Sequence, residues 1–169
     1  MPKLLIARAA LALVWAGALV LAVGHKVPTT DADLPAAAAA LLATYPLIDV
    51  IASVFSGRRV NAAISATAAI AIAVTGFGAD AGATLIAFGA WAVVSGAIQF
   101  ATALHHRRTT GGGQVAMLTS GGLSTLAGIS FLSAAGMDDA HLAMLGGYMA
   151  VGAVLYLVAA ARSRHPQAA

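Results

Sequence analysis

The sequence contains no cysteine and no glutamate, and only 9% of its 169 residues are charged. Without cysteine, disulfides, thiolate metal sites and cysteine nucleophiles are excluded. The shortage of charge excludes a soluble domain, because such domains carry roughly a quarter charged residues and need polar groups to cover their surface. The chain is instead 60% hydrophobic, with a mean hydropathy of +0.90. The sequence therefore predicts an integral membrane protein whose main partner is the lipid bilayer.

Six apolar intervals are long enough to cross a bilayer, whose ~30 Å hydrocarbon core needs about 20 residues of helix. They lie at roughly 4–24, 35–56, 61–79, 82–104, 115–135 and 141–161, separated by short polar loops. These intervals predict an all-α fold, with residues 1–169 forming one domain of six transmembrane helices. We interpret the first interval as a retained span and not as a signal peptide, because Arg8 interrupts an apolar run that is long for such a segment.

Basic and acidic residues alternate between the loops. The predicted basic side carries Lys3, Arg8, Arg58, Arg59, Arg107, Arg108, Arg162 and Arg164. The opposite side carries Asp31, Asp33, Asp80, Asp138 and Asp139, with Lys26 as its one cation. Because Lys and Arg collect on cytoplasmic loops, both termini are predicted to be cytoplasmic. Membrane topology also accounts for the net charge of +3, so no nucleic-acid partner is predicted.

The even-numbered spans share a pattern. The fourth and sixth spans align without a gap, and Gln99 falls on Tyr156. In the second span, Asp49 precedes an arginine pair by nearly the same distance as Gln99 does. We interpret the chain as three helical-hairpin repeats in parallel orientation, each turning at an acidic loop and ending at a basic one.

Two motifs carry a resemblance to a known family. Tyr45–Asp49 reads aromatic-x-Leu-Ile-Asp, and Gly89–Gly96 reads Gly-x-Trp-x-x-x-x-Gly. With the basic residues that end each even span, these motifs resemble the HdeD-like acid-resistance membrane proteins over residues 35–164, and residues 120–132 are similar to that family's odd-numbered helices. The resemblance implies a small six-span protein of the bacterial inner membrane. It also implies a role in acid or envelope stress, with no defined reaction.

Asp49 is the strongest candidate for a functional residue. A carboxylate inside the bilayer costs at least ~2.5–3.5 kcal/mol on insertion scales, so it normally faces the bundle interior and has a partner. Helical spacing puts Tyr45, Asp49 and Ser53 on one face. Pro46 is expected to kink this span. Arg8 lies near the same membrane edge on the first span, within reach of a long side chain.

Two interpretations of Asp49 stay open. The structural one is an Arg8–Asp49 pair, or a protonated Asp49 that donates to a carbonyl. The functional one is a proton-responsive or substrate-contacting acid. The same face carries Ser95 and Gln99 on the fourth span and Tyr156 on the sixth. These residues predict either ordinary interhelical contacts, worth ~0.6 kcal/mol each, or a shared polar cluster that passes a solute or proton.

Catalytic and metal chemistry are not predicted. His105 and His106 are adjacent, and successive helical residues point in different directions, so they make a poor metal chelate. The sequence shows no Ser/His/Asp constellation and no zinc motif. We therefore predict no enzyme activity, no catalytic residue, no metal site and no cofactor.

Three functions remain. The leading one is a non-enzymatic HdeD-like protein of stress tolerance. The second is a small-solute or proton-coupled transporter or channel that uses Asp49, which would be marked by Asp49 lining a water-filled cavity instead of being closed in a pair. The third is an accessory subunit of a larger membrane complex, marked by an outward-facing stripe of small residues such as 120–128. A homo-oligomer is also open.

Overall fold

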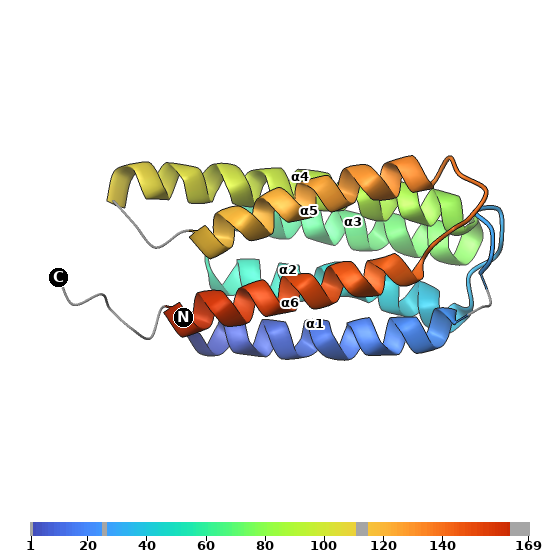
Figure 1. Cartoon of the computed structure of the whole chain (residues 1–169), viewed down its shortest axis with the longest axis horizontal. Helices are drawn as coiled ribbons and strands as arrows, with labels where there is room; N and C mark the ends of the chain where they lie inside the picture. The colour runs from blue at the N-terminus through green and yellow to red at the C-terminus, as the bar shows by residue number, and fades with distance from the viewer. Residues whose placement is uncertain (1, 25–26, 111–114, 163–169) are drawn as a thin grey trace.

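The computed structural model describes residues 2–24, 27–110 and 115–162, and the chain folds there into six α-helices (Figure 1). The helices are α1 (Pro2–Val23), α2 (Ala36–Phe55), α3 (Arg59–Gly78), α4 (Ala81–Thr110), α5 (Val115–Ala134) and α6 (Ala143–Arg162). Each is long and apolar enough to cross a membrane. The predicted all-α class is therefore confirmed for the described residues, as are six helices of membrane-spanning length and hydropathy. Lys26 and Arg164 lie outside them.

The helix ends follow local chemistry. Gly24 (φ +47°) and Gly57 (φ +70°) end the first two helices in left-handed backbone, which glycine adopts without a Cβ clash. The Asp80 carboxylate caps α4 by accepting the backbone N–H of Ala83 at 2.7 Å. α2 continues through Pro46 as one helix. α4 runs six residues past the predicted apolar interval, because basic side chains suit the negative end of a helix.

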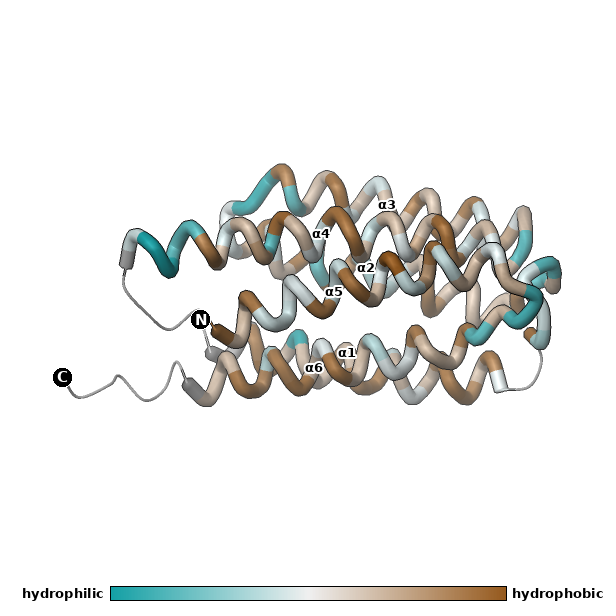
Figure 2. The backbone as a smooth tube through the Cα atoms, turned by 45° about the horizontal axis from the view of Figure 1, so that its top comes forward, coloured by the Kyte–Doolittle hydropathy of each residue, from teal (hydrophilic) through white to brown (hydrophobic). Residues whose placement is uncertain are grey.

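The six helices form a closed ring, since each packs on the next along the chain and α6 packs on α1 (Figures 1 and 2). The first turn of α1 and the last turn of α6 lie at the same end of the bundle. The closest pairs are α4–α5, α2–α3 and α1–α6. The hairpins predicted from the repeat are α1–α2, α3–α4 and α5–α6. The tightest packing therefore crosses the predicted repeat boundaries, and the repeat arrangement stays a prediction.

Glycines set the closeness of the tightest pair, α4–α5. A Cβ on Gly96 would lie 2.8 Å from the carbonyl oxygen of Gly121, and one on Gly128 would lie 2.6 Å from the carbonyl oxygen of Gly89. Real Cβ atoms do not approach backbone atoms this closely, so only glycine permits this helix separation. The small residues at positions 120–128 thus face α4 and not the lipid.

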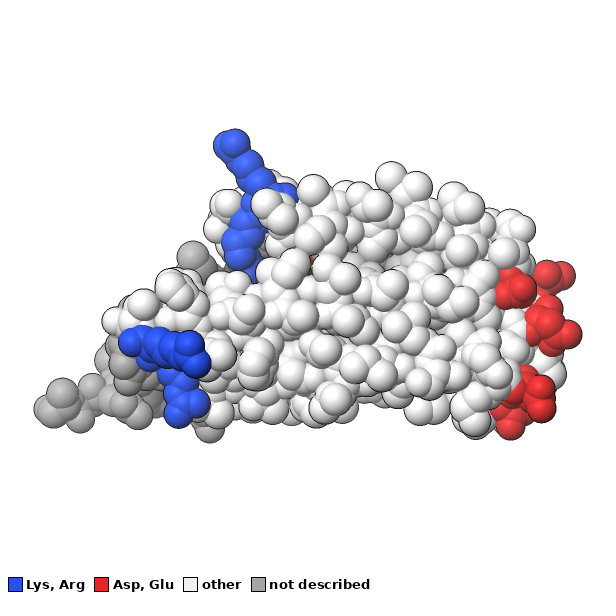
Figure 3. All heavy atoms as spheres, turned by 90° about the horizontal axis from the view of Figure 1, so that it is seen from above, with Lys and Arg blue, Asp and Glu red and all other residues white. Residues whose placement is uncertain are grey.

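The charges separate to the two ends of the bundle, as Figure 3 shows. We call these the acidic end, with the loops between α1 and α2, α3 and α4, and α5 and α6, and the basic end, with the α2–α3 turn and the end of α4. Between them the described surface is apolar, as a lipid-facing belt requires. The separation agrees with the charge pattern from which cytoplasmic termini are predicted, and that orientation stays a prediction.

Backbone hydrogen bonds tie the acidic-end loops together. Thr30 N donates to the carbonyl oxygen of Asp138 at 3.2 Å, and the Thr30 carbonyl oxygen accepts from Gly82 N at 2.7 Å. The Thr30 hydroxyl donates to the Met137 carbonyl oxygen at 2.8 Å. The loop after α1 is therefore bonded both to the α5–α6 loop and to the first turn of α4, and these bonds close the acidic end.

Candidate functional site

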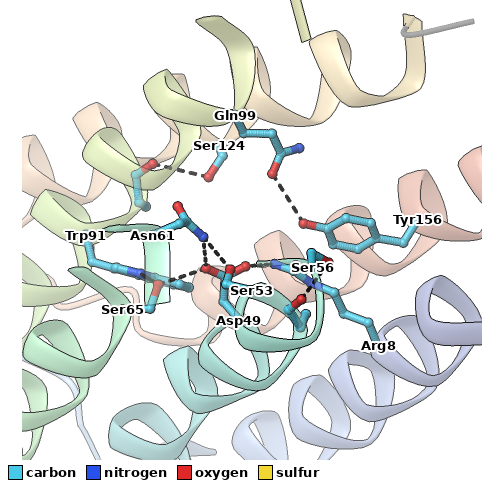
Figure 4. Close-up of polar contacts among 12 residues, drawn as sticks. Arg8, Asp49, Ser53, Ser56, Asn61, Ser65, Trp91, Gln99, Ser124 and Tyr156 are labelled. Atoms are coloured by element: carbon cyan, nitrogen blue, oxygen red, sulfur yellow. Dashed lines mark hydrogen bonds and ion pairs between the residues drawn. The ribbon is translucent and has the colours of Figure 1, made fainter. Parts of the chain in front are cut away.

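The Asp49 carboxylate is the centre of a buried polar network (Figure 4). Arg8 reaches across from α1 and forms an ion pair with Oδ1 of Asp49; the two side chains are 15% and 8% exposed. On the other oxygen, Oδ2, the Asn61 amide donates at 2.6 Å and the Ser65 hydroxyl at 2.8 Å. Three donors from two other helices therefore hold this carboxylate. This is the acceptor-only pattern of an ionised acid.

The network has a fixed hydrogen-bond direction because it begins at a group that can only donate. The indole N–H of Trp91 in α4 donates to the Ser65 hydroxyl at 3.1 Å. Ser65 therefore gives its own proton to Asp49. Asn61 also donates to the Ser53 hydroxyl at 2.7 Å, which links a second residue of α2 to the network. Of the two structural alternatives raised for Asp49, the geometry is that of the Arg8 pair and not of a carboxylic acid donating to a carbonyl.

Arg8 is held on its other side by α6. Its guanidinium carbon lies 4.3 Å from the centre of the Tyr156 ring, a cation–π contact. The Tyr156 hydroxyl donates to Oε1 of Gln99 at 3.4 Å, and Nε2 of Gln99 donates to the Met117 carbonyl oxygen at 3.3 Å. Asp49, Arg8, Tyr156 and Gln99, four of the predicted polar residues, are thereby connected in one chain of contacts.

A cavity of about 70 Å³ adjoins this network. Because a water molecule occupies ~30 Å³ in the liquid, the cavity has room for roughly two waters or for a solute of a few atoms. All six helices contribute to its lining, and its polar side chains include Arg8, Asp49, Asn61, Ser95, Gln99 and Ser124. Asp49 is thus both paired and beside a cavity, so the marker chosen for a transporter is met only in part.

The cavity is closed toward the acidic end. Its lining reaches no further toward the acidic end than Tyr45, Trp91 and Tyr148. The other lining residues lie toward the basic end, where Arg58 of the α2–α3 turn completes the cavity. Those three rings pack with Phe88 and Phe131 at centroid separations of 5.2 to 6.0 Å. We call these five residues the aromatic layer. Beyond it, buried leucines fill the bundle at positions 19, 85 and 145.

The predicted site residues are distributed unevenly around this cavity. Tyr45 lies in the aromatic layer and Ser53 accepts from Asn61, while Ser95 lines the cavity without taking part in a hydrogen bond within the described chain. Sequence reasoning missed Asn61, Ser65, Trp91, Ser124 and Tyr148. The spacing of Asn61 and Ser65 held a usable signal, since two polar residues four apart in an apolar run share one helix face.

Two further contacts between polar side chains do not involve Asp49. Ser124 in α5 is within 2.7 Å of the Tyr148 hydroxyl and also donates to the Ala92 carbonyl oxygen at 3.2 Å, so it joins α4, α5 and α6. The rings of His105 and His106 lie 6.2 Å apart at the basic end. Within the described residues, no group of three or more His, Cys, Asp or Glu side chains is arranged to hold a metal ion.

Comparison with known proteins gives one match. Residues 60–133 match the model of a family described as a short repeat of unknown function, DUF308. The matched segment holds Asn61, Ser65 and Gln99, whereas Arg8, Asp49 and Tyr156 lie outside it. No curated protein and no solved structure matches the chain. The chain is thus a multi-pass membrane protein with a segment similar to this short repeat.

Proposed function

We propose that this chain is a non-enzymatic, HdeD-like protein of the bacterial inner membrane that contributes to tolerance of acid or envelope stress. Three features support the proposal. The motifs at Tyr45–Asp49 and Gly89–Gly96 resemble that family, and the DUF308 match covers the second of them. The separation of charge to two ends suits a protein inserted with both termini in the cytoplasm.

The observation that carries the proposal is that the interior of the bundle is closed toward the acidic end. Both carboxylate oxygens of Asp49 already accept from protein donors, three in all. The aromatic layer and the bonded loops lie between its cavity and the acidic end. This arrangement supports a role that depends on a stable bundle closed at one end more than one that needs a passage from end to end.

Deletion of the gene in its own host tests the proposal. We expect lower survival than the parent strain after an acid challenge, restored by the wild-type chain. Asp49→Asn should restore survival poorly, because it removes the charge that Arg8 requires. Asp33→Asn, which changes an exposed loop carboxylate, is the matched control and should restore survival fully. If the deletion strain survives acid and envelope stress as well as the parent strain does, the proposal is contradicted.

One observation favours a transporter as the second candidate: the cavity reaches Asp49 from the basic end. A proton or solute path through Asp49 would need the aromatic layer to open. Purified protein in liposomes should then show a flux driven by a pH gradient, which Asp49→Asn abolishes while the protein stays folded. We expect no such flux. A robust proton-coupled current that is lost in Asp49→Asn would replace the leading proposal with this one.

The third candidate, an accessory subunit, was to be marked by an outward-facing stripe of small residues, and the structure does not show that feature at 120–128. The stripe at 120–128 packs against α4 through Gly121 and Gly128 and is therefore not available to a partner in the lipid.

A further inference from the structure

The cavity beside Asp49 holds polar groups that the Asp49 network does not use. Arg58 lies exposed at its basic end, and Tyr45 and Ser95 line its interior. None of these three side chains takes part in a hydrogen bond or ion pair with another described residue. The guanidinium and the two hydroxyls can therefore donate to a ligand.

The charges around the cavity favour an anion. Its charged lining residues are Arg8, Arg58 and Asp49, which sum to one net positive charge. Arg59, Arg107 and Arg108 lie at the same end of the bundle and extend the positive field outside it. Such a field raises the local concentration of anions at an opening. A cation would find few free oxygen ligands there, since both carboxylate oxygens of Asp49 already accept from donors.

Size restricts the ligand further. A volume of about 70 Å³ holds a halide ion or a carboxylate of one or two carbons, but not a nucleotide or a sugar phosphate. We propose that the cavity is a binding site for one small monovalent anion, which enters from the basic end past the positive charge of Arg58 and is held by the hydroxyl groups of Tyr45 and Ser95. The inference goes beyond the proposed stress role and does not depend on it.

The chain offers its own optical probe for this site. It has two tryptophans, Trp15 and Trp91, and only Trp91 lines the cavity. In Trp15→Phe protein, held in a neutral detergent without anionic lipid, fluorescence therefore reports on Trp91 alone. Iodide quenches indole fluorescence on contact, so an iodide titration at constant ionic strength follows access to the site. We expect quenching that saturates, and that chloride or formate reverses by competition.

Matched variants at two neighbouring arginines separate a site from a general surface charge. In the Trp15→Phe background, Arg58→Gln should weaken iodide and chloride binding about tenfold, because it removes the positive charge that lines the basic end of the cavity. Arg59→Gln removes the same charge next to it, at a residue that does not line the cavity, and should change binding by no more than about twofold. Tyr45→Phe removes one hydroxyl at constant shape and should weaken binding about threefold.

Two outcomes would overturn the inference. The first is quenching that rises linearly with iodide and ignores chloride, because it would mean collision without a site. The second is equal weakening by Arg58→Gln and Arg59→Gln, because it would mean surface potential alone. Circular dichroism of each variant checks that the helices are intact. If Arg58→Gln does not fold, an unchanged affinity in Tyr45→Phe would still contradict the proposed site.

Discussion

The indole N–H of Trp91 donates to the Ser65 hydroxyl at 3.1 Å, and this contact makes Ser65 a donor to Asp49. A residue of α4 thus orients a residue of α3 that holds a carboxylate of α2. The three helices are coupled through one hydroxyl group, which is buried with an exposed fraction of 0%. Buried networks of this kind are stabilising when every member is satisfied and costly when one is removed.

Removal of that hydroxyl should therefore destabilise the fold. In Ser65→Ala, the Trp91 N–H and one position on Asp49 lose their partner, which costs about 1–3 kcal/mol in the free energy of unfolding. Unfolding by a denaturing detergent in mixed micelles measures the loss. Ser130→Ala is the matched control, since the Ser130 hydroxyl is exposed and bonds only to its own helix, and should change stability by less than ~0.5 kcal/mol. Equal effects would mean that the Trp91–Ser65–Asp49 contacts do not contribute.

The Arg8–Asp49 pair makes a second prediction. Asp49→Ala leaves a buried guanidinium without its partner and should cost about 3–5 kcal/mol. Arg8→Leu with Asp49→Leu removes both charges and should recover much of that loss. The single variants Arg8→Leu and Asp49→Leu complete a double-mutant cycle on the same unfolding measurement, which gives the coupling energy between the two sites. A double variant as unstable as the sum of the two single variants would show that the residues do not interact.

Two adjacent glycines of α5 should respond differently to alanine. A Cβ on Gly121 would lie 2.6 Å from the backbone nitrogen of Phe100, whereas one on Gly122 would lie 3.7 Å from the nearest atom of the Phe100 ring. Gly121→Ala should therefore push α4 and α5 apart and destabilise the protein by about 1–3 kcal/mol. In Gly122→Ala the new Cβ would lie at an ordinary contact distance, so this substitution should leave the stability unchanged or raise it slightly. Thermal unfolding in detergent compares them, and equal midpoints would refute the close α4–α5 packing.

The orientation in the membrane makes the last prediction. Because the natural chain has no cysteine, single cysteines can report on each end. Asp33→Cys at the acidic end should react with a membrane-impermeant thiol reagent added to intact cells. Thr109→Cys, equally exposed but at the basic end, should react only after the membrane is permeabilised. Labelling of Thr109→Cys in intact cells would place the basic end outside and reverse the predicted topology.

Much of the architecture was predictable because it depends on local composition. The length of each apolar interval predicted the spans, and five helices end within a few residues of the expected positions. α4 was the exception. Its last turns, including Arg107 and Arg108, are polar and are helical only as a continuation of the span, so hydropathy could not reveal them. The sequence also predicted that Asp49 is buried, since a carboxylate in an apolar span must turn inward. It predicted as well that Ser53 lies on the same face of the helix.

A partner of Asp49 was predictable from the sequence only where its residue type is unusual inside a membrane span. Arg8 stood out because a charge inside a span is costly, and the structure places it on Asp49. Asn61 and Ser65 did not stand out, because Asn61 lies beside a polar turn and a serine within a span is common. Their roles depend on the rotation of α3 about its axis, which is set by packing against α2.

The sequence by itself determined that the chain is a six-helix membrane protein with its loop charges at opposite ends, because the bilayer requires apolar spans of a set length and makes an unpaired charge inside them costly. The tertiary structure alone decided which helices pack most closely, where the cavity lies and which end is closed. Those features arise from contacts between distant segments, such as Gly96 on Gly121 and the aromatic layer around Phe88. In lipid, where apolar surface does not select one helix face over another, such packing and polar contacts choose the partners.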